Sequence, residues 1–174
     1  MTSHINWDAY RGPPGREHYR LLEELSKSFE NRDLFDIGTW TGASAYAMSR
    51  GNNQVYSFDI EHRFPLLTIP NVSYHLDDLM SDAGKEKWKD KILGSAFIML
   101  DIDPHEGTRE YDFYCWLRDN DYKGFMVCDD IWLFKEMRDN FWKKIPDEHK
   151  IDVSHRGHHS GTGIIRFHRS AMWP

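Results

Sequence analysis

The chain has 174 residues, a length that suits one domain with a single sizeable core. It carries 22 Lys and Arg against 28 Asp and Glu, a net charge of −6 with no long basic run, which argues against sequence-independent nucleic-acid binding. Its two cysteines lack metal-type spacing, and the sequence shows neither a secretion signal nor an apolar segment of bilayer length. These features predict a soluble, cytoplasmic protein that binds neither nucleic acid nor membrane.

The beginning of the chain is polar and aromatic, and it ends in a Gly-Pro-Pro-Gly sequence at 12–15. This turn chemistry predicts an N-terminal arm or lid over 1–15, followed by one domain over 16–174. Trp7 and Tyr10 either cover a ligand or pack on the surface, and surface packing is the favoured interpretation.

A buried strand followed by a glycine-bearing turn is predicted at 34–42, after an amphipathic helix over 16–30 that carries Phe29 on its apolar face. Residues 43–49 are typical of the next helix, so the turn lies at a helix N-terminus, where glycines let a ligand approach unpartnered N–H groups. Trp40 occupies the middle glycine position of the dinucleotide pattern Gly-x-Gly-x-x-Gly and would crowd a pyrophosphate. A compact ligand without phosphates therefore fits better. The alternative is that this is an ordinary strand, turn and helix, in which the glycines serve only packing and no ligand binds.

Acidic residues follow the second and third predicted strands, over 54–59 and 72–76. Asp59 ends the second strand, where an acid accepts hydrogen bonds from ribose hydroxyls in nucleotide-binding folds, and a solvated carboxylate is the alternative. Asp78 follows the third strand and precedes a helical stretch that runs to about Ile92. It is either a ligand contact or a helix cap, and the residues favour neither.

The second half of the chain alternates strands and helices. A helix is predicted from Thr108, and another from the spacing of Phe134, Met137, Phe141 and Ile145, ended by Pro146. Strands are predicted at 95–100, 124–128, 150–154 and 162–168. Seven strands with alternating helices predict an open, mostly parallel α/β sheet.

Four carboxylates follow two neighbouring strands of this predicted sheet, Asp101 and Asp103 after one and Asp129 and Asp130 after the other. Parallel strands lie about 5 Å apart and their carboxyl ends meet at one edge, so these acids would crowd one small volume. A divalent cation is the natural counter-charge. Ligation by oxygen atoms favours Mg²⁺, with Mn²⁺ and Ca²⁺ as alternatives.

The glycine turn resembles the first motif of class I S-adenosylmethionine-dependent methyltransferases, through the run Asp-Ile-Gly-Thr-Trp-Thr-Gly-Ala-Ser at 36–44. Two further motifs resemble those of the metal-dependent sugar O-methyltransferases of the macrocin and noviose type: Leu-Asp-Ile-Asp-Pro-His-Glu-Gly-Thr at 100–108 and Gly-Phe-Met-Val-Cys-Asp-Asp at 124–130. The likeness to catechol-type O-methyltransferases is weaker. The resemblance implies a Rossmann-like methyltransferase fold, with a seven-stranded, mostly parallel sheet, an antiparallel terminal strand and helices on both faces.

The resemblance also implies roles for individual residues. Asp101, Asp129 and Asp130 match the metal ligands, while Asp59 would bind the ribose and Asp78 would lie near the adenine amino group. The implied contacts of the cofactor, S-adenosylmethionine, are Asp36, Gly38, Thr39, Trp40, Gly42, Ser44, Asp59, Asp78 and Asp101.

Two residues compete for the role of general base. Asp103 matches the acid that takes the proton of the acceptor hydroxyl in the sugar enzymes, as the oxygen attacks the sulfonium methyl group. His105 is the alternative because its unperturbed pKa lies near neutrality, and Asp103 is favoured. Catechol-type enzymes place a lysine base where this chain has Pro104, so their mechanism does not transfer.

The expected function is Mg²⁺-dependent methyl transfer from S-adenosylmethionine to a hydroxyl of a sugar or sugar-containing small molecule. A catechol or phenol acceptor is the enzymatic alternative, and a non-catalytic S-adenosylmethionine-binding protein is the alternative of another class. The chain is shorter than a typical sugar methyltransferase, so a lid or dimer arm is expected to be missing. The sequence does not decide whether the chain forms a homo-oligomer. His155, His158 and His159 suggest a zinc site, a substrate contact or, most simply, a solvated loop.

Overall fold

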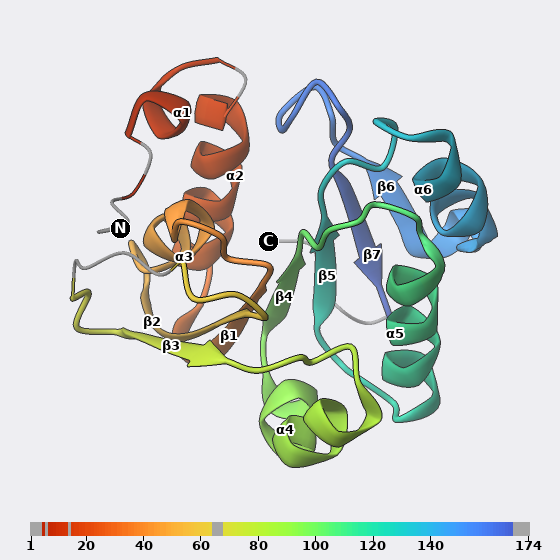
Figure 1. Cartoon of the computed structure of the whole chain (residues 1–174), viewed down its shortest axis with the longest axis horizontal. Helices are drawn as coiled ribbons and strands as arrows, with labels where there is room; N and C mark the ends of the chain where they lie inside the picture. Colours follow the sequence, from red (N-terminus) through yellow and green to blue (C-terminus); the bar gives the residue numbers. More distant parts are fainter. Residues whose placement is uncertain (1–4, 6, 14, 64–67, 169–174) are drawn as a thin grey trace.

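A sheet of seven strands forms the centre of the computed structural model, which describes residues 5, 7–13, 15–63 and 68–168. The strands are β1 (Glu30–Ile37), β2 (Asn52–Asp59), β3 (Val72–Leu76), β4 (Phe97–Leu100), β5 (Phe125–Cys128), β6 (Lys150–Asp152) and β7 (Gly163–Arg166). Their order across the sheet is β3-β2-β1-β4-β5-β7-β6 (Figure 1). The first five in this order run parallel, whereas β7 runs antiparallel to both β5 and β6. The predicted sheet, including an antiparallel strand near its end, is confirmed.

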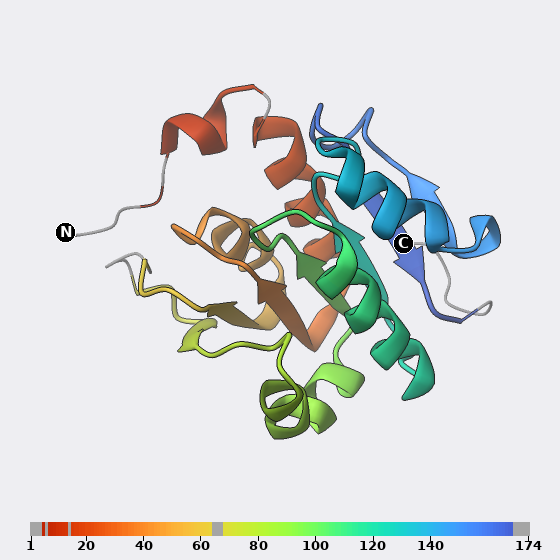
Figure 2. The same cartoon turned by 45° about the vertical axis from the view of Figure 1, so that its right-hand side comes forward.

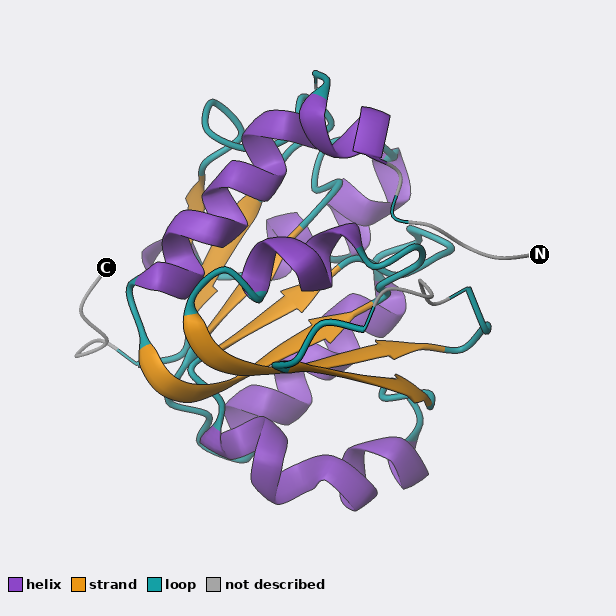
Figure 3. Cartoon of the chain, turned by 90° about the vertical axis from the view of Figure 1, so that its left-hand side faces the viewer, coloured by secondary structure: helices purple, strands orange, loops and turns teal. Residues whose placement is uncertain are grey.

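Helices cover both faces of the sheet, as predicted (Figure 3). They are α1 (Trp7–Arg11), α2 (Gly15–Lys27), α3 (Ala43–Met48), α4 (Asp82–Gly94), α5 (Thr108–Asp119) and α6 (Lys135–Asn140), with short 3-10 helices η1 (Trp142–Lys144) and η2 (Asp147–His149). Among the described residues, we find no helix of the length and apolar character that a membrane crossing requires.

Two buried clusters, one on each face, hold these helices against the sheet, because successive residues of a strand point to opposite faces. Consecutive residues of β4 show this. Ile98 belongs to the cluster that contains Phe113 of α5, together with residues of α4 and α6. Met99 belongs to the cluster that contains Leu22 of α2, together with residues of α3.

The parallel strands β2, β1, β4 and β5 end at one edge of the sheet, which is where open α/β sheets bind ligands. The register pairs Ile37 with Leu100 and Leu100 with Cys128, so the residues that follow these three positions lie at the same level. The glycine turn and both acidic pairs therefore share one edge, as the sequence predicts.

The first amphipathic helix is shorter than predicted. It ends at Lys27 instead of reaching residue 30, and Glu30 already belongs to β1. Phe29 has the right spacing for the helical face, but its ring packs on the sheet, 6.1 Å from the ring of Phe97 and 6.0 Å from that of Phe125. Phe29 thus matches the helical spacing of apolar residues in the sequence, although it lies after the helix and its ring packs on the sheet.

The helix predicted from Phe134 to Ile145 is also wrong in its extent. Only α6 is α-helical, because Phe134 is extended and Phe141, with φ of −120° and ψ of −75°, breaks the helix before η1. Phe141, Trp142 and Ile145 are all buried, although they do not belong to one continuous α-helix.

Aromatic contacts attach α1 to the helices that follow it. The ring of Trp7 lies 5.0 Å from that of Tyr46 on α3, and Tyr10 stacks on Tyr19 of α2 at 5.0 Å. Trp7 and Tyr10 therefore pack against α3 and α2. The arm predicted over 1–15 stays a prediction, and residues 1–4, 6 and 14 lie outside the described residues.

Candidate active site

The turn after β1 approaches β4 so closely that only glycine fits at its first position. Gly38 has a φ of 89°, and a Cβ atom there would lie 1.7 Å from the backbone oxygen of Asp101. Gly42, with a φ of 83°, precedes α3, and Trp40 between them has a φ of 45°. The glycine pattern therefore reflects a close approach of two backbones at the ligand edge of the sheet.

A cavity of about 370 Å³ opens beside this turn. Small-molecule sites in proteins span about 300–1,000 Å³, so its volume suits a compact ligand. Five of the residues predicted to contact the cofactor line the cavity: Gly38, Trp40, Asp59, Asp78 and Asp101. Asp103 lines it as well, whereas the other four predicted contacts, Asp36, Thr39, Gly42 and Ser44, are not among the described residues that form its wall.

Backbone N–H groups hold the carboxylate of Asp59 at the cavity wall. The N–H of Trp40 donates to Oδ2 at 2.7 Å, and the N–H of Glu61 donates to Oδ1 at 3.0 Å. The tip of β2 is thereby tied to the glycine turn, and Asp59 is oriented before any ligand binds.

Asp78 is a cavity residue and does not cap α4. Ser81 is the N-cap, since its hydroxyl accepts a hydrogen bond from the N–H of Gly84 at 3.0 Å. Arg109 of α5 donates to both carboxylate oxygens of Asp78, at 3.0 and 3.2 Å, and the N–H of Met80 donates to Oδ1. The structure therefore gives the capping role to Ser81, and a ligand contact of Asp78 stays a prediction.

Asp36 lies buried beneath the turn, where the hydroxyl of Ser57 donates to its Oδ2 at 2.8 Å. Burial raises the pKa of this carboxyl to about 6, although the hydroxyls of Ser44, Ser57 and Thr39 act in the opposite direction. Asp36 and Ser44, both predicted cofactor contacts, thus lie together under the turn that forms the cavity wall.

The variant Asp36→Asn should be more stable than the wild type at about pH 7.5 and similar to it near pH 4. A pKa raised on folding means that the stability contribution of Asp36 is complete below its unfolded-state pKa of about 4 and is lost as the pH rises through about 6. Asn carries no charge and keeps the oxygen that accepts from Ser57, so the gain should approach about 3 kcal/mol. Urea unfolding without cofactor at both pH values measures the difference, and equal stability at the higher pH would contradict the expectation.

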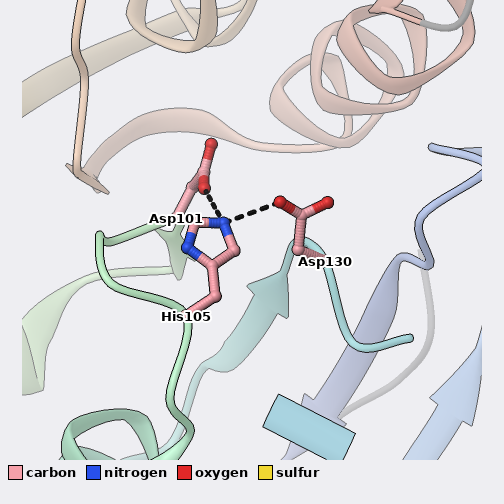
Figure 4. Close-up of side chains that lie close together, drawn as sticks. All are labelled: Asp101, His105 and Asp130. Atoms are coloured by element: carbon pink, nitrogen blue, oxygen red, sulfur yellow. Dashed lines mark ion pairs between the residues drawn. The ribbon is translucent and has the colours of Figure 1, made fainter. Parts of the chain in front are cut away.

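The acids after β4 and β5 converge on one imidazole (Figure 4). Nε2 of His105 lies 2.6 Å from Oδ2 of Asp130 and 3.4 Å from Oδ1 of Asp101. Nδ1 of the same ring lies 3.2 Å from Oδ1 of Asp103, whose side chain is 96% exposed. Donor atoms of Asp101, His105 and Asp130 therefore lie close enough together to share one metal ion.

Asp129 lies deeper than Asp130 and shares its electrostatic environment. Burial and the neighbouring charge of Asp130 raise the pKa of Asp129 to about 6. Burial also acts to raise the pKa of Asp130, but hydrogen bonds with His105, His158 and Ser160 outweigh it and hold that pKa well below its usual range. Hydrogen bonds to Asp101 and Asp130 raise the pKa of His105 to about 10. His105 supplies one positive charge to these carboxylates, whose oxygen atoms are also the donors that a divalent cation prefers.

Two histidines also face these acids: His18, which the sequence analysis did not consider, and His158, for which it left a substrate contact open. His18 of α2 has its Nδ1 3.8 Å from Oδ1 of Asp129, and His158 has its Nδ1 3.7 Å from Oδ1 of Asp130. His155 and His159 are exposed, and neither belongs to a potential ion-binding group among the described residues, so the three histidines of the loop do not act as one zinc site. The sequence signal that could have identified His18 is that this polar residue occupies the face of its helix that also carries the buried leucines.

Comparisons with protein-family models and with curated protein sequences give no match. Solved structures do match. MycE methyltransferase from the mycinamycin biosynthetic pathway, in complex with Mg and SAH, gives a TM-score of 0.65 at 13% identity over 93% of this chain and 52% of that chain. TomG, an O-methyltransferase from Streptomyces achromogenes in complex with SAM, gives 0.58 at 12% identity over 92% of this chain and 87% of that chain. An O-methyltransferase from Bacillus cereus in complex with SAH gives 0.54 at 14% identity over 88% and 80%.

The likeness concerns the fold, because the sequence identities are low. This chain spans about half of the length of MycE and most of the length of the two other proteins. The described sheet order and helices, together with these matches, show that the chain has the Rossmann-like fold of S-adenosylmethionine-dependent O-methyltransferases.

Proposed function

We propose that the protein is a divalent-metal-dependent O-methyltransferase that transfers a methyl group from S-adenosylmethionine to a hydroxyl of a sugar or sugar-containing small molecule. One observation carries this proposal: the cavity and the carboxylate cluster share Asp101. A methyl donor in the cavity and an acceptor hydroxyl at the cluster would lie side by side. Positioning of this kind accounts for much of the acceleration of a two-substrate reaction.

The residues of the cluster suit the metal part of the proposal. Asp101, Asp129 and Asp130 would hold the ion, which when bound would lower the pKa of the acceptor hydroxyl. MycE, which shares the fold, was solved in complex with Mg and SAH and also with mycinamycin VI. The magnesium in these complexes supports a metal for the present chain, and the motifs at 100–108 and 124–130, which resemble those of sugar O-methyltransferases, support a sugar acceptor.

Asp103 is the proposed general base. Its exposed carboxylate lines the cavity, and it can accept a proton from a hydroxyl that enters from solvent. Nε2 of His105 faces Asp101 and Asp130, whereas Nδ1 lies 3.2 Å from Oδ1 of Asp103 without forming a hydrogen bond. Hydrogen bonds to Asp101 and Asp130 raise the pKa of His105 to about 10, so the ring already carries its second proton near neutral pH, which favours Asp103 over His105 as the base.

Asp103→Asn should abolish turnover and leave cofactor affinity nearly unchanged, because the amide keeps the shape but accepts no proton. A loss of roughly 10²–10⁴-fold in kcat is expected for a general base. The measurement is S-adenosylhomocysteine formation at saturating cofactor. Asp112→Asn, an exposed change on α5, is the matched control and should retain full activity. Retained turnover in Asp103→Asn would refute the assignment.

Asp59→Ala should weaken S-adenosylmethionine binding by about 100-fold, because hydrogen bonds to a charged group contribute about 1.5–3 kcal/mol each. The expected partners are the ribose hydroxyls. Calorimetric titration with S-adenosylmethionine, and with NAD as the competing cofactor class, measures the effect. Asp59→Asn keeps an acceptor for the N–H of Trp40 or Glu61, so it separates ligand binding from the support of the turn. Equal affinity in the alanine variant would show that the ribose role is wrong.

The function itself is tested by methyl transfer to a panel of monosaccharides, glycosides, catechols and phenols, with and without a chelator. We expect turnover with a sugar hydroxyl that the chelator removes and added Mg²⁺ restores. Chelator-insensitive transfer would overturn the metal mechanism. Turnover only with catechols or phenols would replace the acceptor class. Cofactor binding without turnover on any acceptor would favour a non-catalytic S-adenosylmethionine-binding protein.

A further inference from the structure

Three consecutive apolar side chains are exposed directly beside the acid cluster. Trp132, Leu133 and Phe134 are 42%, 48% and 48% exposed, and only the buried Ile131 separates them from Asp130 in the sequence. Large apolar side chains that stand singly on a surface are ordinary, whereas a contiguous group of them marks a surface that binds something. We call Trp132, Leu133 and Phe134 the apolar patch.

Hydrogen bonds fix the backbone of the apolar patch on both sides. The N–H of Trp132 donates to the backbone oxygen of Ser160 at 2.9 Å, and the N–H of Leu133 donates to the backbone oxygen of Asp130 at 3.1 Å. Figure 2 shows the segment between β5 and α6 beside the loop between β6 and β7, which carries Ser160. The patch is therefore held in one place before a ligand arrives.

The indole of Trp132 is exposed and yet held in one orientation. Its Nε1–H donates to Oδ2 of Asp152 on β6 at 2.8 Å. The ring also lies against Gly161, where a Cβ atom would come within 2.5 Å of Cδ1 of the indole. A ring whose polar atom is already paired and whose orientation is fixed loses little conformational entropy when a ligand packs on it.

Phe134 connects the apolar patch with the acids. Its ring lies edge-on to the imidazole of His105, with 5.9 Å between the two centroids. Nε2 of the same imidazole lies 2.6 Å from Oδ2 of Asp130 and 3.4 Å from Oδ1 of Asp101, and Asp101 also lines the cavity. A molecule whose hydroxyl reaches the acids would therefore meet apolar surface immediately beside them.

The size of the apolar patch suits part of a small molecule. Lys135 and Glu136 follow Phe134, and both are exposed and charged, so the apolar run ends there. A specific protein interface buries about 800 Å² on each partner and involves about 20–30 residues, far more than three side chains supply. Small-molecule sites, in contrast, combine a few apolar and aromatic side chains with a small number of polar groups.

We propose that the apolar patch binds a hydrophobic substituent of the acceptor, so that the preferred acceptor is amphiphilic, such as a glycoside with an apolar aglycone. This inference rests on the proposed function and specifies its acceptor. The acids receive the hydroxyl, and the patch removes the neighbouring alkyl or ring surface of the same molecule from water. A free monosaccharide makes only the first of these contacts and should bind more weakly.

The test is calorimetric titration of the full chain with octyl glucoside against methyl glucoside, and with octylcatechol against catechol, in the presence of S-adenosylhomocysteine and below the micelle concentrations. Octyl glucoside should bind at least about tenfold more tightly than methyl glucoside. In the double variant Trp132→Ala/Phe134→Ala this ratio should fall to about one. Leu76→Ala, which removes another exposed apolar side chain, on β3, is the matched control and should keep the ratio. Urea unfolding and S-adenosylhomocysteine binding verify that each variant is folded.

Two results would overturn the role of the patch: octyl compounds that bind no more tightly than their counterparts, and an octyl preference that the double variant retains. Either result is compatible with methyl transfer to glucosides, which is measured separately, so the proposed function can stand when the patch fails. Preference for octylcatechol over catechol, with no binding of either glucoside, would keep the patch and overturn the sugar acceptor. Light scattering covers the remaining occupant, since a dimer that the double variant dissociates would assign the patch to a second copy of the chain and overturn its role in acceptor binding.

Discussion

Gly38→Ala should destabilise the protein by about 3 kcal/mol or more and remove both cofactor binding and turnover. A Cβ atom at this position would lie 1.7 Å from the backbone oxygen of Asp101 and 2.6 Å from its carbonyl carbon. The φ of 89° adds strain for any residue with a side chain. Relief requires β1 and β4 to separate at the edge where the cavity and the acids meet.

Gly94→Ala is the control for this variant, because a Cβ atom there meets nothing within 4 Å. It should leave stability within about 0.5 kcal/mol of the wild type and leave activity unchanged. Urea unfolding and calorimetry with S-adenosylmethionine measure the two effects. If Gly38→Ala unfolds like the wild type and binds the cofactor normally, then the close approach of β1 and β4 is not the reason why this position needs glycine.

Asp130→Asn should lower kcat by about 10³-fold or more, while cofactor affinity stays near that of the wild type. The loss follows because Asp130 belongs to both groups of potential ion ligands, with His105 on one oxygen and His158 on the other. Removing its charge weakens ion binding, and the several kcal/mol that an ion contributes to the transition state correspond to such a factor.

The asparagine variant is a clean test because Asp130 has a φ of 57°. Asn tolerates this left-handed conformation as well as Asp does, so the backbone at the end of β5 should not change. Asp121 has a φ of 58° and a side chain that is 78% exposed, so Asp121→Asn makes the same chemical change away from the site and should be silent. Full methyl transfer by Asp130→Asn at low metal concentration would contradict a catalytic ion at this position.

Much of the fold could be predicted because each central strand is an apolar run that ends in an acid or a glycine. Such runs mark strands covered on both faces, and the parallel arrangement then brings their ends to one edge. Asp101 and Asp130 are close together for this reason, as the sequence predicts. The helix ends could not be predicted, since Phe29 and Phe141 satisfy helical spacing while packing in the core by other means.

The histidines at the site illustrate a different limit. His18 and Asp129 lie far apart in the sequence, and no local pattern connects a helix near the beginning of the chain with the tip of the fifth strand. The approach depends on how α2 crosses the sheet. His158 likewise stood in a loop whose composition suggested solvent exposure, whereas a tight contact with Ser160 turns its ring inward. Only tertiary structure decides which of several loop histidines faces the acids.

The position of β7 between β5 and β6 has a consequence for synthesis on the ribosome. The chain makes β6 first, yet β6 pairs only with β7 among the described strands, so it has no neighbour until Gly163–Arg166 has emerged. During that interval the backbone edge of β5 is open to pairing with other chains. A nascent or truncated polypeptide that stops before β7 should therefore aggregate, although the strands that line the cavity, β1, β2 and β4, are already complete.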